Sequence, residues 1–128
     1  MIPKNKILRY KKLLVQNCKS CNGESCSKCI SSSARVDIYA ECEIPPTYWP
    51  LAFKDFSGDS NFKSLVSDAL RDIDGLYDSG RSLIFTGGLG TGKTYAACSI
   101  LKMASVSGYN SKYTTMATII SSMLSSNT

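Results

Sequence analysis

Apolar residues recur at helical spacing near the start of the chain. Between residues 4 and 16 the pattern places apolar side chains on one side of a helix and lysines and arginines on the other. The apolar set is Ile7, Leu8, Tyr10, Leu13, Leu14 and Val15. We therefore expect an amphipathic helix that either docks on a partner protein or nucleic-acid backbone, or packs on its own module with a solvated basic face.

A second helical pattern covers residues 59 to 76. Asp59 or Ser60 is a suitable N-cap, and the pattern runs to about Leu76. Its apolar residues follow helical spacing and form one stripe: Phe62, Leu65, Val66, Ala69, Leu70 and Ile73. The pattern predicts one continuous helix before the glycines Gly75 and Gly80.

The second half of the chain alternates strand-like and helix-like segments. Residues 82–86 (SLIFT) form a short apolar, β-prone run, and residues 95–105 have helical spacing that Gly108 should end. Residues 111–115 indicate a second strand, and residues 116–124 a second helix. This alternation predicts an α/β fold.

Between these regions lie irregular segments. The serines at 31–33 indicate a linker, and prolines stiffen residues 43–50 into an extended strap. Four aromatic residues occur in or just after this strap: Tyr48, Trp49, Phe53 and Phe56. They either line an adenine pocket or anchor the strap against the core.

The most specific motif stands between the first predicted strand and its helix. Residues 87–94 match G-x-x-x-x-G-K-[ST], the P-loop or Walker A pattern. The loop residues are Gly87, Gly88, Leu89, Gly90, Thr91, Gly92, Lys93 and Thr94. Glycines let the backbone wrap closely around a phosphate, and the helix N-terminus offers unpaired N–H groups. The motif predicts binding of a nucleoside triphosphate, ATP in the first instance.

Individual roles follow from this chemistry. Lys93 can reach the β- and γ-phosphates as a point charge, and the Thr94 hydroxyl can bind Mg²⁺. Both are therefore the candidate catalytic residues, and Tyr95, next along the helix, completes the candidate nucleotide-binding set.

Four cysteines form a second candidate site. Cys18, Cys21, Cys26 and Cys29 have the spacing C-x₂-C-x₄-C-x₂-C, which suits a structural Zn²⁺ centre. Unligated thiols, an iron–sulfur cluster or disulfides are the alternatives. Cys98 falls within the helix after the P-loop, where it is expected to be a small buried residue.

Composition narrows the classes of function. The net charge of +5 favours polyanionic partners only weakly, and the absence of histidine excludes mechanisms that need an imidazole. We find no membrane-spanning run and no signal peptide, so we expect a cytoplasmic protein, or the host cytoplasm if a phage encodes it.

The segment after the P-loop lacks an acidic residue. No Asp or Glu follows Thr94, whereas a working P-loop ATPase needs a later carboxylate to hold Mg²⁺ and position water. We therefore expect the N-terminal part of a larger ATPase, with its Walker B acid beyond Thr128 and with poor hydrolysis by this chain alone.

The order of motifs resembles one family. The cysteine module, the strap Ile44-Pro45-Pro46-x-Tyr48-Trp49, the pair Phe53 and Phe56, and the P-loop are similar to DnaC-type helicase loaders and IstB-type transposition ATPases. These are AAA+ proteins. Thr47 replaces a frequent arginine of that strap, and Tyr95 a frequent histidine.

The resemblance implies both an architecture and a role. It implies a truncated P-loop NTPase core of the AAA+ type (59–128), preceded by a basic helix and zinc module (1–34) and a linker strap (35–58). In that family the strands at 82–86 and 111–115 are not neighbours, so they would lack partners in this chain and leave it marginally stable with exposed sheet edges.

The implied function is ATP-dependent loading of a replicative helicase onto DNA, with the helicase and single-stranded DNA as partners and a homo-oligomer as the assembly. The alternative functions are a zinc-containing, nucleotide-sensing adaptor and a transposition-helper ATPase. A P-loop kinase is a weaker candidate than either.

Overall fold

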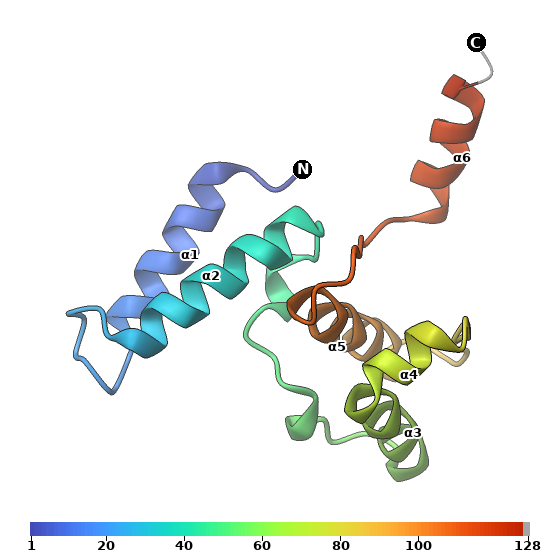
Figure 1. Cartoon of the computed structure of the whole chain (residues 1–128), viewed down its shortest axis with the longest axis horizontal. Coiled ribbons are helices and arrows are strands. Elements are labelled where there is room, and N and C mark those ends of the chain that lie inside the picture. Colours follow the sequence, from blue (N-terminus) through green and yellow to red (C-terminus); the bar gives the residue numbers. More distant parts are fainter. Residues whose placement is uncertain (127–128) are drawn as a thin grey trace.

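A computed structural model describes residues 1–126 of the chain. It contains six α-helices and two short 3₁₀-helices, and no β-strand occurs within the described residues. The predicted α/β fold, a P-loop NTPase core of the AAA+ type, is therefore wrong for this chain. Figure 1 shows α2, α3 and α4 next to α5, α1 running along α2, and α6 standing away from the others.

The N-terminal part is a helical hairpin. Helix α1 (Lys4–Gln16) has the predicted bounds, and α2 (Ser27–Glu41) runs back along it, with the cysteine loop at the turn (Figure 1). The serines at 31–33 lie inside α2, so the linker predicted there is wrong. A run of three serines does not break this helix, because other residues of α2, such as Val36 and Ala40, are buried against other elements and stabilise it.

Two 3₁₀-helices form a strap along α5 (Lys93–Val106). They are η1 (Pro46–Tyr48) and η2 (Phe53–Asp55), and both contact α5. The half-buried side chain of Lys102 on α5 donates from its ammonium to the backbone carbonyls of Tyr48, Trp49 and Leu51. The strap is therefore bonded to α5 at several carbonyls in succession.

The helix predicted over 59–76 is two helices. The Asp59 cap is confirmed, because its Oδ2 accepts from the Phe62 amide at 2.8 Å and α3 (Ser60–Arg71) begins there. At Asp72 the backbone leaves the helical region (φ −131°, ψ 61°), and its carboxylate accepts from the Gly75 amide as the cap of α4 (Ile73–Asp78). The break arises because an aspartate can bond a nearby amide in place of continuing the helix.

The last two helices have nearly the predicted bounds. Helix α5 ends before Gly108, which has the left-handed φ of 93° that the prediction required. Helix α6 (Met116–Ser126) forms as expected but buries no residue. Its apolar side chains are exposed: Met116, Ile119, Ile120, Met123 and Leu124.

Two buried clusters hold the helices together. One joins α2 to the strap and α5 through Val36, Ile44, Trp49 and Cys98, with Tyr10 of α1 packed against it. The other joins the strap to α3 and α5. Its buried members are Phe53, Phe56, Val66 and Ala96. Helix α5 therefore belongs to both clusters.

The two predicted strands are absent for one physical reason. Residues 82–86 make no backbone hydrogen bond within the described chain, and 111–115 make a single inter-segment bond, from the Tyr113 amide to the Cys42 carbonyl at 2.8 Å. A strand requires a ladder of such bonds to a neighbour, and neither segment has one. The predicted exposed sheet edges are therefore absent too, although Leu83 and Ile84 are exposed. Within residues 1–126, no helix combines the length and apolar character needed to cross a bilayer.

Candidate phosphate-binding loop and candidate metal centre

The loop at 87–94 leads directly into the N-terminus of α5. Gly87, Gly90 and Gly92 have φ values of 148°, 74° and 90°, which L-residues with side chains rarely adopt. Gly92 is the residue before the first turn of α5. These three glycines, of which Gly87 and Gly92 occupy the two glycine positions of the motif, therefore set the course of the loop.

A neighbouring ring also requires glycine at position 92. A Cβ built on Gly92 would come within 2.9 Å of Phe56 Cζ and closer still to Cε2. Phe56 is buried and stacks on Phe53, with ring centroids 5.0 Å apart. The strap therefore contacts and supports the loop through the Phe56 ring.

The Lys93 side chain folds back over the loop. Its ammonium donates to the carbonyls of Gly87 at 2.8 Å and Gly88 at 2.5 Å, and to Thr91 Oγ1 at 3.2 Å. Thr91 Oγ1 in turn donates to the Gly88 carbonyl at 2.9 Å. The ammonium therefore lies inside the curve of the loop and is bonded to neutral carbonyls. An anionic phosphate would bind the ammonium more strongly than these carbonyls do.

The backbone amides of the loop are free. None of the N–H groups from Gly87 to Tyr95 donates to a protein acceptor among the described residues, and the first paired amide is that of Ala96. Unpaired amides at a helix N-terminus, next to the positive end of the helix dipole, are a ready anion site. The Thr94 hydroxyl is exposed and has no hydrogen-bond partner among the described residues, so it is available to a cation.

Tyr95 has a different role from the other candidate residues. Its hydroxyl donates to the Ala52 carbonyl at 2.6 Å, and its ring packs edge-on against Phe53 and Phe56. Burial raises the pKa of this hydroxyl. Its side chain therefore ties the loop helix to the strap, and only its backbone amide remains for a phosphate.

The aromatic residues of the strap are core anchors. Trp49, Phe53 and Phe56 are each at most 8% exposed, and Trp49 Nε1 donates to the Ile44 carbonyl at 2.8 Å. Of the two alternatives that the sequence leaves open, anchoring is the one that their burial supports.

The four cysteines of the hairpin converge. Cys18 and Cys21 lie in the turn after α1, Cys26 immediately precedes α2, and Cys29 is buried in the first turn of α2. All four Sγ atoms lie within 4.8 Å of one another. Three of these pairs are Cys18–Cys26 at 3.8 Å, Cys21–Cys29 at 3.7 Å and Cys26–Cys29 at 3.7 Å.

These distances suit a tetrahedral metal ion. Four sulfurs at about 2.3 Å from Zn²⁺ are separated by about 3.8 Å from each other. They are far outside disulfide length, and all four cysteines are free. The cluster could therefore hold a metal ion such as Zn²⁺.

The short linker between the two cysteine pairs is accommodated by its backbone. Asn22, Gly23 and Ser25 have φ values of 50°, 92° and 69°, so the chain reverses within four residues. The Glu24 amide donates to the Cys21 carbonyl at 3.0 Å within this turn. Left-handed residues are what allow C-x₄-C spacing to close around one point.

The cysteines influence one another's protonation. The Cys29 amide lowers the pKa of the Cys26 thiol. Burial raises the pKa of Cys21, but hydrogen bonds from the Cys18 thiol and the Gly23 amide outweigh it and lower this pKa to about 6. In contrast, Cys42 and Cys98 are isolated in the core, and burial raises the pKa of Cys98, which confirms its expected role as a small buried residue.

Sequence reasoning missed Lys102, whose ammonium also lies 5.6 Å from the centre of the Tyr39 ring. Burial lowers its pKa. No local pattern distinguishes it from a surface lysine, because its partners lie about fifty residues away.

Comparison with protein-family models, with curated proteins and with solved structures finds no match. The resemblance to helicase loaders therefore depends on the motif residues alone.

Proposed function

We propose that this chain binds a nucleoside triphosphate, ATP with Mg²⁺, at residues 87–94. The observation that supports it best is the Lys93 ammonium, held inside a loop whose backbone amides are unpaired from Gly87 to Tyr95. The phosphates would replace the Gly87 and Gly88 carbonyls as partners of Lys93, and Thr94 would supply a hydroxyl to Mg²⁺. The proposal concerns the loop and the start of α5 and requires no β-sheet.

The test is calorimetric titration of the full chain with Mg-ATP. Lys93→Ala should weaken binding at least tenfold, because it removes the only side-chain cation of the loop. Lys54→Ala is the matched control and should leave the affinity unchanged, because Lys54 is an exposed lysine of the strap with no ion pair to any residue from 1 to 126. Equal affinities of the wild type and Lys93→Ala would refute the proposal.

ATP turnover by this chain should be slow. Residues 95–128 contain no carboxylate side chain that could hold Mg²⁺ or orient an attacking water. We therefore propose binding as the activity of the chain and ATPase activity as a property that needs an additional acidic residue.

We propose that the cysteine cluster holds a structural Zn²⁺ that closes the α1–α2 hairpin. A four-cysteine site has no open position for catalysis, so its role would be to stabilise the fold. The contact between α2 and α5 connects this hairpin to the helix that begins at the loop.

The biological role we propose is loading of a replicative helicase onto DNA, as the motif resemblance implies. The partners would be the helicase and single-stranded DNA. A nucleotide-sensing zinc adaptor is the second candidate, supported by the cysteine cluster in a chain whose loop is followed by no acidic residue. Helicase capture that requires ATP supports the loader, whereas capture independent of nucleotide supports the adaptor.

A further inference from the structure

The positive charge of this protein is concentrated in its N-terminal hairpin. Residues 1–35 contain eight of the 15 lysines and arginines but only one of the ten acidic residues, Glu24. The remaining residues have more acids than bases. Such asymmetry within one chain is typical of a polyanion-binding module.

The exposed face of α1 collects part of this charge. Asn5, Arg9, Lys12 and Gln16 follow one another at helical spacing and are all exposed. The opposite side of α1, with Ile7, Tyr10 and Leu14, packs on the core. At 1.5 Å per residue, the row from Asn5 to Gln16 extends about 16 Å. We call it the α1 basic row.

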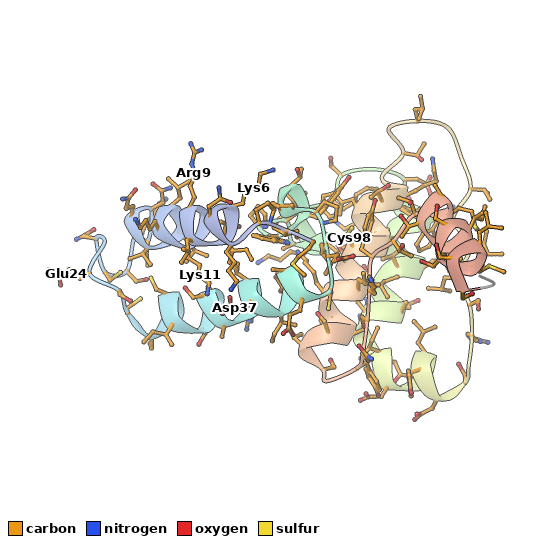
Figure 2. All side chains as sticks on the ribbon, turned by 90° about the horizontal axis from the view of Figure 1, so that it is seen from above. Lys6, Arg9, Lys11, Glu24, Asp37 and Cys98 are labelled. Carbon is orange, nitrogen blue, oxygen red and sulfur yellow. The ribbon has the colours of Figure 1, made fainter. Side chains whose placement is uncertain are left out.

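The cations of this row are not neutralised within the protein. Lys11, on the flank of α1, is paired with Asp37 of α2 at 2.7 Å, whereas Arg9 and Lys12 have no acidic partner among the described residues. Figure 2 shows Lys11 directed at Asp37 and Arg9 projecting away from α2. The row is therefore available to an external anion.

The aromatic content indicates which polyanion fits. Tyr10 is the sole aromatic residue in residues 1–35, and its ring packs edge-on against Trp49, with centroids 5.0 Å apart. Binding of single strands normally uses exposed rings on which bases stack. A surface with cations and amides but no ring suits the backbone of a duplex, whose charge density is one phosphate per about 1.7 Å.

We propose that the α1 basic row binds the phosphate backbone of double-stranded DNA without reading its sequence. Arg9 and Lys12 neutralise phosphates, and Asn5 and Gln16 donate to phosphate oxygens. A membrane surface fits less well, because Ile7, Tyr10 and Leu14 pack on the core. The exposed Leu8 and Leu13 lie on opposite flanks of the basic row, so they form no continuous apolar face that could enter a bilayer. This interaction is separate from the nucleotide loop and does not depend on it.

The test measures fluorescence anisotropy of a labelled 30-base-pair duplex and of the matching single strand. We expect wild-type affinity for the duplex in the micromolar range at about 100 mM NaCl, falling with salt, and weaker binding of the single strand. Arg9→Gln with Lys12→Gln should reduce duplex affinity about tenfold and lower the slope of log affinity against log salt by about 1.8.

A control with the same charge change removes cations elsewhere. Lys54→Gln with Arg81→Gln should alter duplex affinity less than twofold, since both side chains are exposed and neither forms an ion pair within the described part of the chain. Zinc content of the Arg9/Lys12 variant should equal that of the wild type, which separates loss of binding from loss of folding. Lys93→Ala should keep duplex binding, so failure of the nucleotide proposal is recognised independently.

Three results would overturn the proposal. They are equal losses in the two double variants, tighter binding of the single strand than of the duplex, and binding of phosphatidylserine vesicles that depends on Arg9 and Lys12 while the duplex is not bound.

Discussion

The ring of Phe56 lies against the backbone of Gly92, so the strap and the loop at 87–94 share one contact. Any Cβ at position 92 would overlap that ring, and its φ of 90° disfavours a side chain in any case. The two positions belong to segments that are far apart in the sequence. The contact explains why the loop keeps its shape although no sheet supports it among the described residues.

This contact predicts the effect of Gly92→Ala. The substitution should lower the free energy of unfolding by about 2 to 4 kcal/mol, because it adds left-handed strain to an overlap with Phe56. Urea denaturation followed by circular dichroism measures it. Gly88→Ala is the matched control, since Gly88 has no positive φ and an added Cβ would meet nothing within 4 Å, so its cost should stay under about 1 kcal/mol. Equal costs for the two variants would contradict the described packing.

Lys102→Met tests how the strap is held. The methionine keeps most of the apolar stem but leaves the carbonyls of Tyr48, Trp49 and Leu51 without their charged donor. We expect a loss of about 2 to 3 kcal/mol in the free energy of unfolding, measured by urea denaturation. Lys54→Met, whose side chain is exposed, should change it by under about 0.5 kcal/mol. A Lys102→Met protein as stable as the wild type would show that these bonds contribute nothing net.

Removal of the metal should open the hairpin. Cys21→Ser leaves three thiolates, so zinc content measured by mass spectrometry should fall from one per chain to well below one, with loss of helical signal from α1 and α2. Cys42→Ala is the control, because Cys42 lies in the core and not in the cluster, and it should retain one zinc per chain. Protein purified without chelator that contains no zinc would remove the basis of the assignment.

Zinc retention should depend on pH with a definite sign. Metal binding needs thiolates, so protons compete with it and affinity falls as pH falls. At Cys21 burial is outweighed by hydrogen bonds, which lower the pKa to about 6, whereas at Cys29 a backbone hydrogen bond at Cys26 is outweighed by burial and by bonds to the other thiols, which raise this pKa to about 12. Protons therefore compete with the metal for the thiols over a wide pH range, and release of zinc to a zinc-sensitive dye should increase steadily as the pH is lowered. Retention that improves on acidification would be incompatible with cysteine ligands.

Asp72→Ala tests the break between α3 and α4. The carboxylate caps α4 through the Gly75 amide, at 3.1 Å, and its loss should cost about 1 kcal/mol in thermal or urea unfolding. Asp68→Ala removes an exposed carboxylate that pairs with Arg71 in the same helix and should cost under about 0.5 kcal/mol. A larger loss of stability for Asp68→Ala than for Asp72→Ala would show that the Asp72 cap does not stabilise the break between α3 and α4.

Several elements were predictable from local sequence because their determinants are local. Helix α1 has the predicted bounds, the Asp59 cap begins α3, and Gly108 follows the end of α5. Capping bonds and glycine conformations involve residues within one turn, so a pattern a few residues long contains the information. The same is true of the four cysteines, because their spacing indicates a shared site and their sulfur atoms do lie together.

The predicted strands were wrong because a strand is not a local object. Residues 82–86 have strand composition, yet their amides and carbonyls need a neighbouring ladder that no described segment supplies. Asp72 is a milder case: the apolar stripe runs through it, but a competing side-chain bond ended the helix. At residues 31–33 the error was the opposite one: the serines predicted a linker, but burial of α2 against its neighbouring elements keeps them helical.

By itself, the sequence determined where glycines permit the loop at 87–94, which thiols can meet in the hairpin, and which face of α1 is basic, since each depends on spacing along a short stretch. Only the tertiary structure decided that the described chain is helical, that Phe56 supports Gly92, that Tyr95 and Lys102 bind the strap, and that the strap aromatics are core anchors. Those outcomes depend on contacts between residues far apart in the chain, whose free energies of burial and hydrogen bonding no local pattern encodes.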